Sequence, residues 1–220
     1  VRYYSTYLPE LYRMVLRQSS EFLKETLNEQ QRKNMKRSRP KILLATNLDD
    51  AMAMYEKYKS NLLGVISDVG FCEHRGGKPE EEKLDAGLNL VRHIKADDPK
   101  MPILLQSSQD SICPVAEELG VGFLRKYSKT LMIQLYDYIK EEFAFGDFIF
   151  RDADRVEYGR AANLKELEVL MREIPEDILL ANTSKNMLSK WFMARGLFTL
   201  GAKFKKVSES HFANVAELRA

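Results

Sequence analysis

Three side chains with complementary chemistry follow three apolar runs in the middle of the sequence. Asp68 ends the run LLGVIS, Ser107 ends PILLQ, and Lys126 follows GFLR. If these runs are neighbouring parallel strands, their carboxyl ends meet at one edge of the sheet, where open α/β sheets bind ligands. A carboxylate, a hydroxyl and an ammonium group on one rim suit an anionic phosphoryl group carried by the carboxylate. The spacing therefore predicts a phosphoryl site centred on Asp68.

Apolar runs alternate with helical patterns through this middle segment. Continuous apolar strands separated by helices are typical of a parallel sheet covered on both faces. We expect strands over residues 41–45, 62–69, 101–108 and 121–126, and helices over 49–60, 88–96, 115–120 and 129–143. Asp49 and Asp50 fall in the first turn of a predicted helix, where the helix dipole explains acidic residues. The polar stretch over 72–85 predicts a long, mobile insertion that overhangs the rim at Asp68.

The order and spacing of these residues resemble the receiver domain of two-component response regulators, over about residues 40–143. The resemblance implies a flavodoxin-like, doubly wound parallel sheet of five strands. It implies that Asp68 is the phosphoacceptor and that Ser107 and Lys126 bind the phosphoryl group. It also implies that Phe123, inside the last strand, is the aromatic residue that changes rotamer on phosphorylation.

Two positions depart from the receiver pattern. Where that family places two acidic residues to hold Mg²⁺, this chain has Thr46 and Asn47. Phosphoryl transfer to Asp68 brings several negative charges together, and Mg²⁺ normally offsets their repulsion. Asn47 offers a neutral carbonyl oxygen and Asp68 one carboxylate, so we expect a weak Mg²⁺ site at these two residues and a degenerate receiver. Tyr127 stands where the family has Pro, which predicts a different loop beside Lys126.

Charge divides the chain into three segments. Residues 1–41 carry a net charge of +6, residues 42–142 a net charge of −5, and residues 143–220 a net charge of +1. Apolar residues recur at helical spacing from Leu8 to about Met35, which predicts a long amphipathic helix followed by a basic linker. We therefore expect three parts, residues 1–39, 40–143 and 144–220.

The sequence pattern of residues 144–220 predicts a small α-rich module. We expect a hairpin over 147–161, a helix capped by Asn163 and another helix over 184–204. Its sequence faintly resembles a module found in bacterial proteins that have a phosphoenolpyruvate synthase or pyruvate phosphate dikinase-like region. The residues that carry this second resemblance are Asn186, Ser189, Trp191, Ala194 and Arg195.

Composition excludes several classes of protein. The chain has 220 residues, of which 45% are hydrophobic and 30% charged, which is typical of a folded globular protein. No apolar run approaches the roughly 18 residues that a membrane helix requires. The two cysteines, Cys72 and Cys113, suit a reducing cytoplasm. We do not expect nucleic-acid binding, because the acidic middle and the balanced tail offer no basic recognition helix.

We therefore expect a cytoplasmic, non-enzymatic signalling module of a larger bacterial protein. The chain does not begin with Met, which suggests a piece of a longer protein. Its expected partners are other protein domains, a histidine kinase as phosphodonor in a phosphorelay, and a second copy of the chain. The second copy would pair through the helix over 129–143 or through the N-terminal helix. The alternative is a structural interaction or dimerisation module in which Asp68 is not phosphorylated.

Overall fold

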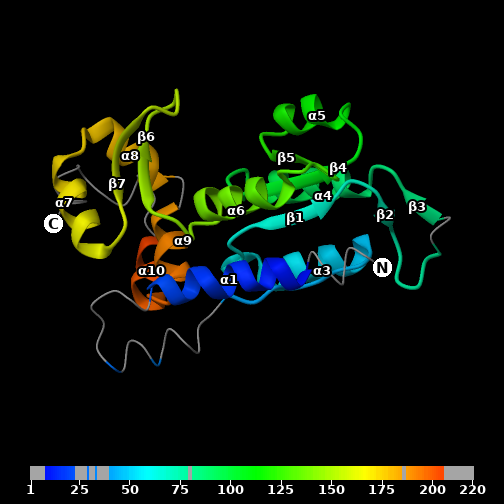
Figure 1. Ribbon diagram of the computed structural model, residues 1–220, viewed down its shortest axis with the longest axis horizontal. Helices are drawn as coiled ribbons and strands as arrows, with labels where there is room; N and C mark the ends of the chain where they lie inside the picture. Colours follow the sequence, from blue (N-terminus) through cyan, green and yellow to red (C-terminus); the bar gives the residue numbers. More distant parts are fainter. Residues whose placement is uncertain are drawn as a thin grey trace. The chain divides into compact units, whose positions relative to one another are not determined.

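The computed structural model (Figure 1) describes residues 8–22, 29, 33, 40–78, 81–184 and 187–205. Contacts divide the chain into two compact units. The first unit runs from Lys41 to Tyr138, and the second combines the described residues up to Pro40 with those from Ile139 onward. The predicted division into residues 1–39, 40–143 and 144–220 stays a prediction.

A three-stranded parallel sheet forms the centre of the first unit. Its strands are β1 (Val65–Asp68), β4 (Ile103–Ser107) and β5 (Gly122–Arg125), in the order β1-β4-β5. All five residues of β4 are buried, as expected for a central strand with both faces covered. The register pairs Asp68 with Gln106 and Ser107 with Arg125, so the carboxyl ends of the three strands lie at one edge.

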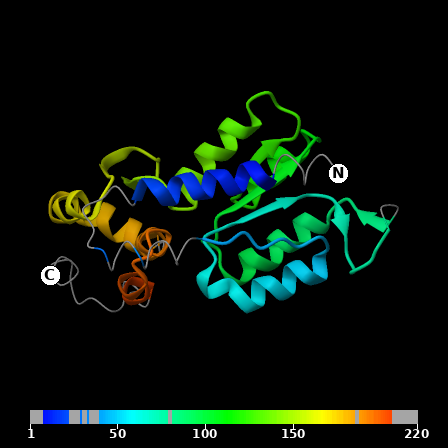
Figure 2. The same cartoon turned by 60° about the horizontal axis from the view of Figure 1, so that its bottom comes forward.

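Helices connect these strands and cover the sheet. They are α3 (Leu48–Tyr58), α4 (Ala86–Asp97), α5 (Ile112–Glu118) and α6 (Leu131–Glu142), with a short 3-10 turn, η2 (Lys59–Asn61), after α3. Helices α3 and α4 lie side by side (Figure 2). Tyr55 of α3 and Val91 and Ile94 of α4 pack with Ile103 and Leu105 of β4 in one buried cluster. Burial of such apolar surface, at about 25 cal/mol per Å², is the main force that holds these helices on the sheet.

The segment 41–45 differs from the predicted fold. It has no regular secondary structure, and Leu43 and Leu44 are exposed, so the strand predicted there is wrong. A short apolar run has the composition of a strand, but a strand also needs a hydrogen-bonded neighbour. Among the described residues, β1 pairs only with β4. The five-stranded sheet is therefore not confirmed, and the first unit is a mixed α/β unit with three parallel strands.

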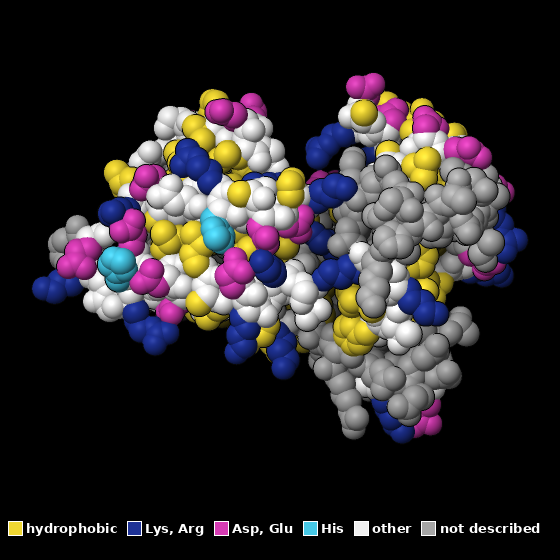
Figure 3. Space-filling model, turned by 180° about the vertical axis from the view of Figure 1, so that it is seen from behind, with side chains coloured by type: hydrophobic (Ala, Val, Ile, Leu, Met, Phe, Trp, Pro, Cys, Tyr) yellow, Lys and Arg dark blue, Asp and Glu magenta, His cyan; other side chains and the backbone are white. Residues whose placement is uncertain are grey.

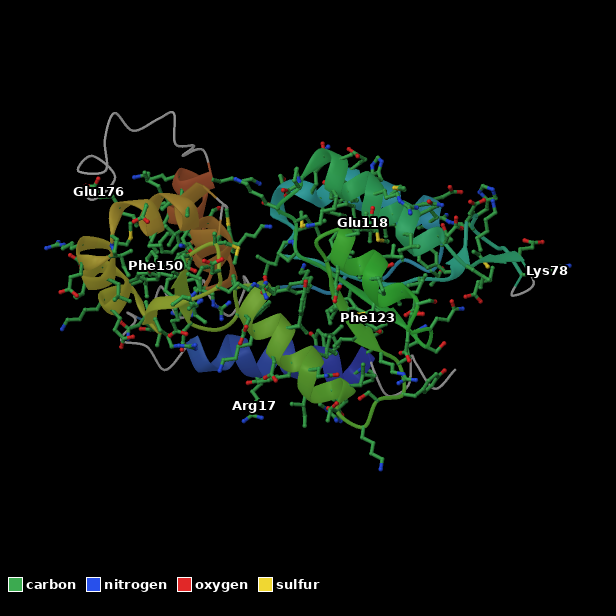
Figure 4. The ribbon with its side chains drawn as sticks, turned by 90° about the horizontal axis from the view of Figure 1, so that it is seen from above. Arg17, Lys78, Glu118, Phe123, Phe150 and Glu176 are labelled. Carbon is green, nitrogen blue, oxygen red and sulfur yellow. The ribbon has the colours of Figure 1, made fainter. Side chains whose placement is uncertain are left out.

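The polar stretch after Asp68 contains a short hairpin. Strands β2 (Phe71–Cys72) and β3 (Glu82–Lys83) pair antiparallel. Lys83 Nζ lies 2.8 Å from Glu73 Oε2 within this segment. Lys78 lies at its far end in Figure 4. Residues 70–85 are called the β2–β3 hairpin below. Its described part contains two short paired strands, and the mobility predicted for residues 72–85 stays a prediction.

The second unit combines another antiparallel hairpin with helices. Strands β6 (Phe148–Arg151) and β7 (Glu157–Ala161) pair as the sequence predicted for residues 147–161. The helices are α1 (Leu8–Phe22), α7 (Leu164–Glu173), α8 (Glu176–Ser184), α9 (Met187–Ala194) and α10 (Phe198–Lys205). Phe150 of β6 (Figure 4) and Trp191 of α9 are almost completely buried in one apolar cluster.

Local signals explain where these helices begin and end. Asn163 caps α7, since its side-chain oxygen accepts a hydrogen bond from Glu166 N at 3.0 Å, as predicted. The single helix predicted over 184–204 is wrong, because Gly196 adopts a positive φ of 73° and separates α9 from α10. The predicted N-terminal helix is present as α1, and most of its expected continuation to about Met35 lies outside the described residues. None of the described helices combines the length and apolar composition that a membrane span requires.

Candidate functional site

An ion pair joins the carboxyl ends of the two edge strands. Lys126 Nζ lies 3.0 Å from Asp68 Oδ2, and both side chains are partly exposed, at 24% and 29%. Lys126 directly follows β5, and its backbone N–H donates a hydrogen bond of 2.8 Å to the carbonyl of Ser107 at the end of β4. The structure therefore brings Asp68, Ser107 and Lys126 to the same edge of three adjacent strands.

The two oxygens of the Asp68 carboxylate have different surroundings. Oδ2 faces Lys126, whereas Oδ1 is buried and has no hydrogen-bond partner among the described residues. A buried polar oxygen without a partner is costly, so this carboxylate is not placed for stability alone. Oδ2 is the oxygen that an approaching electrophile would meet.

The backbone around Asp68 is tightly held. Gly87, in the first turn of α4, donates its N–H to Val69 O at 2.8 Å. A Cβ at Gly87 would lie only 2.0 Å from the carbonyl oxygen of Asp68, so only glycine fits there. Ser67 Oγ donates to the same carbonyl at 2.8 Å. These contacts fix the end of β1 against the start of α4.

Ser107 is buried and accepts a hydrogen bond from Gln109 N at 3.1 Å. Because a hydroxyl both accepts and donates, its proton is still available for an anion at the rim. Phe123 lies in the middle of β5 (Figure 4), opposite Leu105, and is partly buried against the sheet's apolar cluster. Its proposed rotamer change stays a prediction.

The loop after Lys126 has an unusual residue. Tyr127 adopts a positive φ of 65°, a conformation that residues with side chains rarely take, and 89% of its surface is exposed. The sequence predicted a different loop at this position. An exposed aromatic residue thus directly follows Lys126 in the chain.

Asn47 is a helix cap in this structure. Its side-chain oxygen accepts a hydrogen bond from Asp50 N at 2.8 Å, and its Nδ2 donates to Asp50 Oδ2 at 2.7 Å. Asn47 is buried, whereas the neighbouring Thr46 is exposed. The amide that was predicted to face Mg²⁺ therefore satisfies the first turn of α3.

Both carboxylates of the first turn of α3 are paired with basic side chains from the β2–β3 hairpin. His74 Nδ1 lies 2.9 Å from Asp49 Oδ2, and Arg75 Nη2 lies 2.6 Å from Asp50 Oδ1. The hydrogen bond to Arg75 lowers the pKa of the Asp50 carboxyl, and Asp49 raises the pKa of His74. Acidic, basic and histidine side chains are interspersed on the face shown in Figure 3.

These contacts do not fit a divalent-cation site of the kind that Mg²⁺ needs, with several oxygen ligands around one point. Asp68 supplies one carboxylate, and the oxygen of Asn47 is already an acceptor in the cap. In the part of the chain that the structure describes, no three His, Cys, Asp or Glu side chains are grouped to hold a metal ion. The weak Mg²⁺ site predicted at Asp68 and Asn47 gains no support from these side-chain contacts.

Sequence reasoning did not predict the contacts that His74 and Arg75 make with α3, or the close approach at Gly87. The basic pair lies 25 residues beyond the acidic pair it meets. A usable signal was present, since two adjacent carboxylates and two adjacent basic residues flank the same predicted strand. The close approach at Gly87 has no comparable sequence signal, because a glycine near a helix start has several common causes.

The C-terminal residues singled out by sequence are structural. Trp191 Nε1 and Arg195 Nη2 both donate to the carbonyl of Gly146, at 3.0 and 2.9 Å, and Ser189 Oγ donates to Gly201 O at 2.8 Å. The guanidinium of Arg195 stacks 3.6 Å from the centre of the Trp191 ring. Ala194 is buried beside them, and Asn186 lies outside the described residues. The bonds from Trp191 and Arg195 hold the connection before β6, and the bond from Ser189 joins α9 to α10.

Comparisons of the chain with protein-family models, with curated proteins and with solved structures found no match.

Proposed function

We propose that the first unit is a receiver-like regulatory domain of a larger bacterial signalling protein, with Asp68 as its phosphoacceptor. The observation that carries the proposal is the 3.0 Å contact between Lys126 Nζ and Asp68 Oδ2 at the carboxyl edge of a parallel sheet. Ligands of open α/β sheets bind at this edge. An ion pair with a purely structural role could lie anywhere in the fold, whereas a phosphoryl site needs this edge of the sheet.

The proposed chemistry uses the exposed oxygen of Asp68. Oδ2 attacks the phosphorus of a phosphodonor, the new O–P bond forms, and the donor's bond to phosphorus breaks as its leaving group takes the electron pair. Lys126 neutralises part of the charge that arrives, and the Ser107 hydroxyl donates to a phosphoryl oxygen. The added charge then biases the environment of Phe123 in β5, the strand that Lys126 directly follows. A histidine kinase is the proposed donor.

The proposal includes a finer description of the fold. The strands β1, β4 and β5 would correspond to the third, fourth and fifth strands of a flavodoxin-like doubly wound sheet. Their parallel order and the helices between them support this correspondence. Strand order and connection handedness would be tested by an experimental structure that includes the segment before α3.

The test is chemical phosphorylation followed by intact mass spectrometry. We expect acetyl phosphate to add one phosphoryl group to the parent chain and none to Asp68→Asn. Asp110→Asn is the matched control, because Asp110 also pairs with a basic residue near the sheet's edge, Arg125, at 3.2 Å. Lys126→Ala should lower the extent of labelling. Labelling that survives in Asp68→Asn would disprove the assignment.

The second candidate is an interaction or dimerisation module that needs no phosphorylation. One observation favours it: Ile133 of α6 is 63% exposed, although Leu135 of the same helix is completely buried. We propose that this exposed isoleucine contacts a second copy of the chain, since α6 buries its opposite face through Leu135 and Ile139. Light scattering on the parent and on Ile133→Asp tests this, and a monomeric parent at high concentration would reject it.

A further inference from the structure

Charged side chains of the first turn of α3 pair with charged side chains of the β2–β3 hairpin. Two carboxylates, Asp49 and Asp50, meet two basic side chains, His74 and Arg75. A backbone hydrogen bond of 3.0 Å from Asp49 N to Glu73 O joins the same two segments. The acidic charge of this turn is therefore balanced from within the chain.

The hairpin is anchored independently of these ion pairs. Phe71 packs against the apolar cluster of the first unit, and Lys83 pairs with Glu73 at 2.8 Å. Phe71 therefore fixes the start of the hairpin, and the Glu73–Lys83 pair ties its two arms together. His74 and Arg75 contact α3, although their side chains are 78% and 82% exposed.

The hairpin also lies close to Asp68 along the chain. It begins two residues after Asp68, and His74 is six residues beyond it, so their Cα atoms are at most about 20 Å apart. Without His74 and Arg75, Asp49 and Asp50 would add negative charge near a carboxylate that must accept a phosphoryl group. Like charges at this range repel, most strongly at low ionic strength.

We infer that His74 and Arg75 act as built-in counterions to Asp49 and Asp50 beside the Asp68 rim, so that phosphoryl transfer to Asp68 proceeds without a bound divalent cation. The inference rests on the proposed function of Asp68. Lys126 supplies positive charge at the reacting carboxylate, and His74 and Arg75 cancel the negative charge of the first turn of α3. With acetyl phosphate as donor, the Oδ2–P bond forms as the P–O bond to acetate breaks, and acetate leaves with the electron pair.

The experiment compares the rate of Asp68 labelling by acetyl phosphate in EDTA and in Mg²⁺, at low ionic strength. We expect the two rates to agree within about twofold. The double variant H74Q/R75Q should label about threefold to fivefold more slowly than the parent. A matched control is R92Q/H93Q on α4, where His93 Nε2 pairs with Glu56 at 3.2 Å in the same way; its rate should be unchanged.

A second readout does not depend on labelling. In NMR spectra with added Mn²⁺, the amide signals of Asn47 and Asp68 should broaden no more than signals of surface residues elsewhere. The amide signals of Val69 and Gly87 report whether each variant keeps its fold, since Gly87 N is hydrogen-bonded to Val69 O.

The outcomes distinguish failure of the counterion role from failure of the phosphoacceptor assignment. Labelling of Asp68 only in Mg²⁺, or selective Mn²⁺ broadening at Asn47 and Asp68, would overturn the counterion role and leave the phosphoacceptor in place. Equal rates for H74Q/R75Q and R92Q/H93Q would also overturn it. No labelling under any condition would reject the proposed function itself, and the inference with it.

Discussion

Replacing Gly87 by alanine should disturb the candidate site without touching any of its side chains. Gly87 lies in the first turn of α4, where a Cβ would stand 2.0 Å from the Asp68 carbonyl oxygen and 2.9 Å from Val69 Cα. Cβ atoms are essentially never found closer than 3.0 Å to such atoms. The end of β1 and the start of α4 must therefore separate by about 1 Å.

The expected cost follows from two opposing terms. Overpacking of this kind costs about 1–3 kcal/mol, because the obstacle is backbone that cannot rotate away. Alanine recovers up to about 1 kcal/mol through its higher helix propensity. We expect a net loss of about 1–2 kcal/mol in the free energy of unfolding. A shift of about 1 Å at Asp68 would also stretch its 3.0 Å contact with Lys126 to the limit of an ion pair.

The assay must report on the first unit. Trp191, the single tryptophan, lies in the second unit, so its fluorescence does not follow the site. Urea unfolding followed by amide NMR signals of β1 and β4 measures the stability, and the Lys126 amide shift follows the geometry. Gly120→Ala is the control. Gly120 has a φ of 63° and open space around it, so alanine there strains the backbone and lowers stability without a clash at Asp68. An unchanged unfolding midpoint and Lys126 shift in Gly87→Ala would refute the close approach.

Three further results are expected. Asn47→Ala should lower the unfolding free energy of the first unit by about 1 kcal/mol in urea, because Asp50 N loses its acceptor, whereas Asn47→Ser should restore an acceptor for Asp50 N without adding a carboxylate beside Asp50 Oδ2. Asp49 raises the pKa of His74, so this ion pair stabilises the folded state fully at pH below the ordinary histidine pKa, and its contribution is lost as the pH rises through the raised pKa. Above that pH, the backbone amide of Asp49 should exchange its hydrogen faster, relative to its intrinsic exchange rate. The variant His74→Gln should remove this pH dependence. Arg195→Met should lower the unfolding free energy of the second unit by about 2–4 kcal/mol, measured by Trp191 fluorescence. The Ala144 carbonyl loses the hydrogen bond from Arg195, and the Gly146 carbonyl keeps only the hydrogen bond from Trp191. A smaller effect than that of the surface variant Arg172→Met would contradict this role.

The strands of the sheet were predictable because of how parallel sheets are buried. A strand covered on both faces is apolar along its whole length, and the run over 101–108 accordingly contains β4, all of whose residues are buried. The run over 41–45 has the same composition, yet Leu43 and Leu44 are exposed and no ladder forms. Composition reports whether a segment tolerates burial, whereas strand formation also depends on a hydrogen-bonded neighbour that the segment does not encode.

The site was predictable only where it follows from strand ends. Asp68, Ser107 and Lys126 were placed by the rule that ligands bind at the carboxyl edge, and the structure puts all three there. The hydrogen-bond partners of Asn47 were not predicted, because an asparagine before a helix is equally compatible with a helix cap and with a metal ligand. His74 and Arg75 escaped prediction because their contacts depend on how a 16-residue hairpin folds back, which local pattern does not determine.

The first turn of α3 shows how one pair of carboxylates can serve two purposes. Acidic residues there are explained by the helix dipole alone, and Asp49 and Asp50 do occupy that turn. Their pairing with His74 and Arg75 adds a second purpose, since the same charges anchor the hairpin that follows Asp68. A carboxylate already neutralised by a guanidinium has little to offer a metal ion, because the cation would have to displace it. The contacts of Asp49 and Asp50 therefore agree with the inferred role of His74 and Arg75, in which side chains of the chain itself offset the charge of this turn.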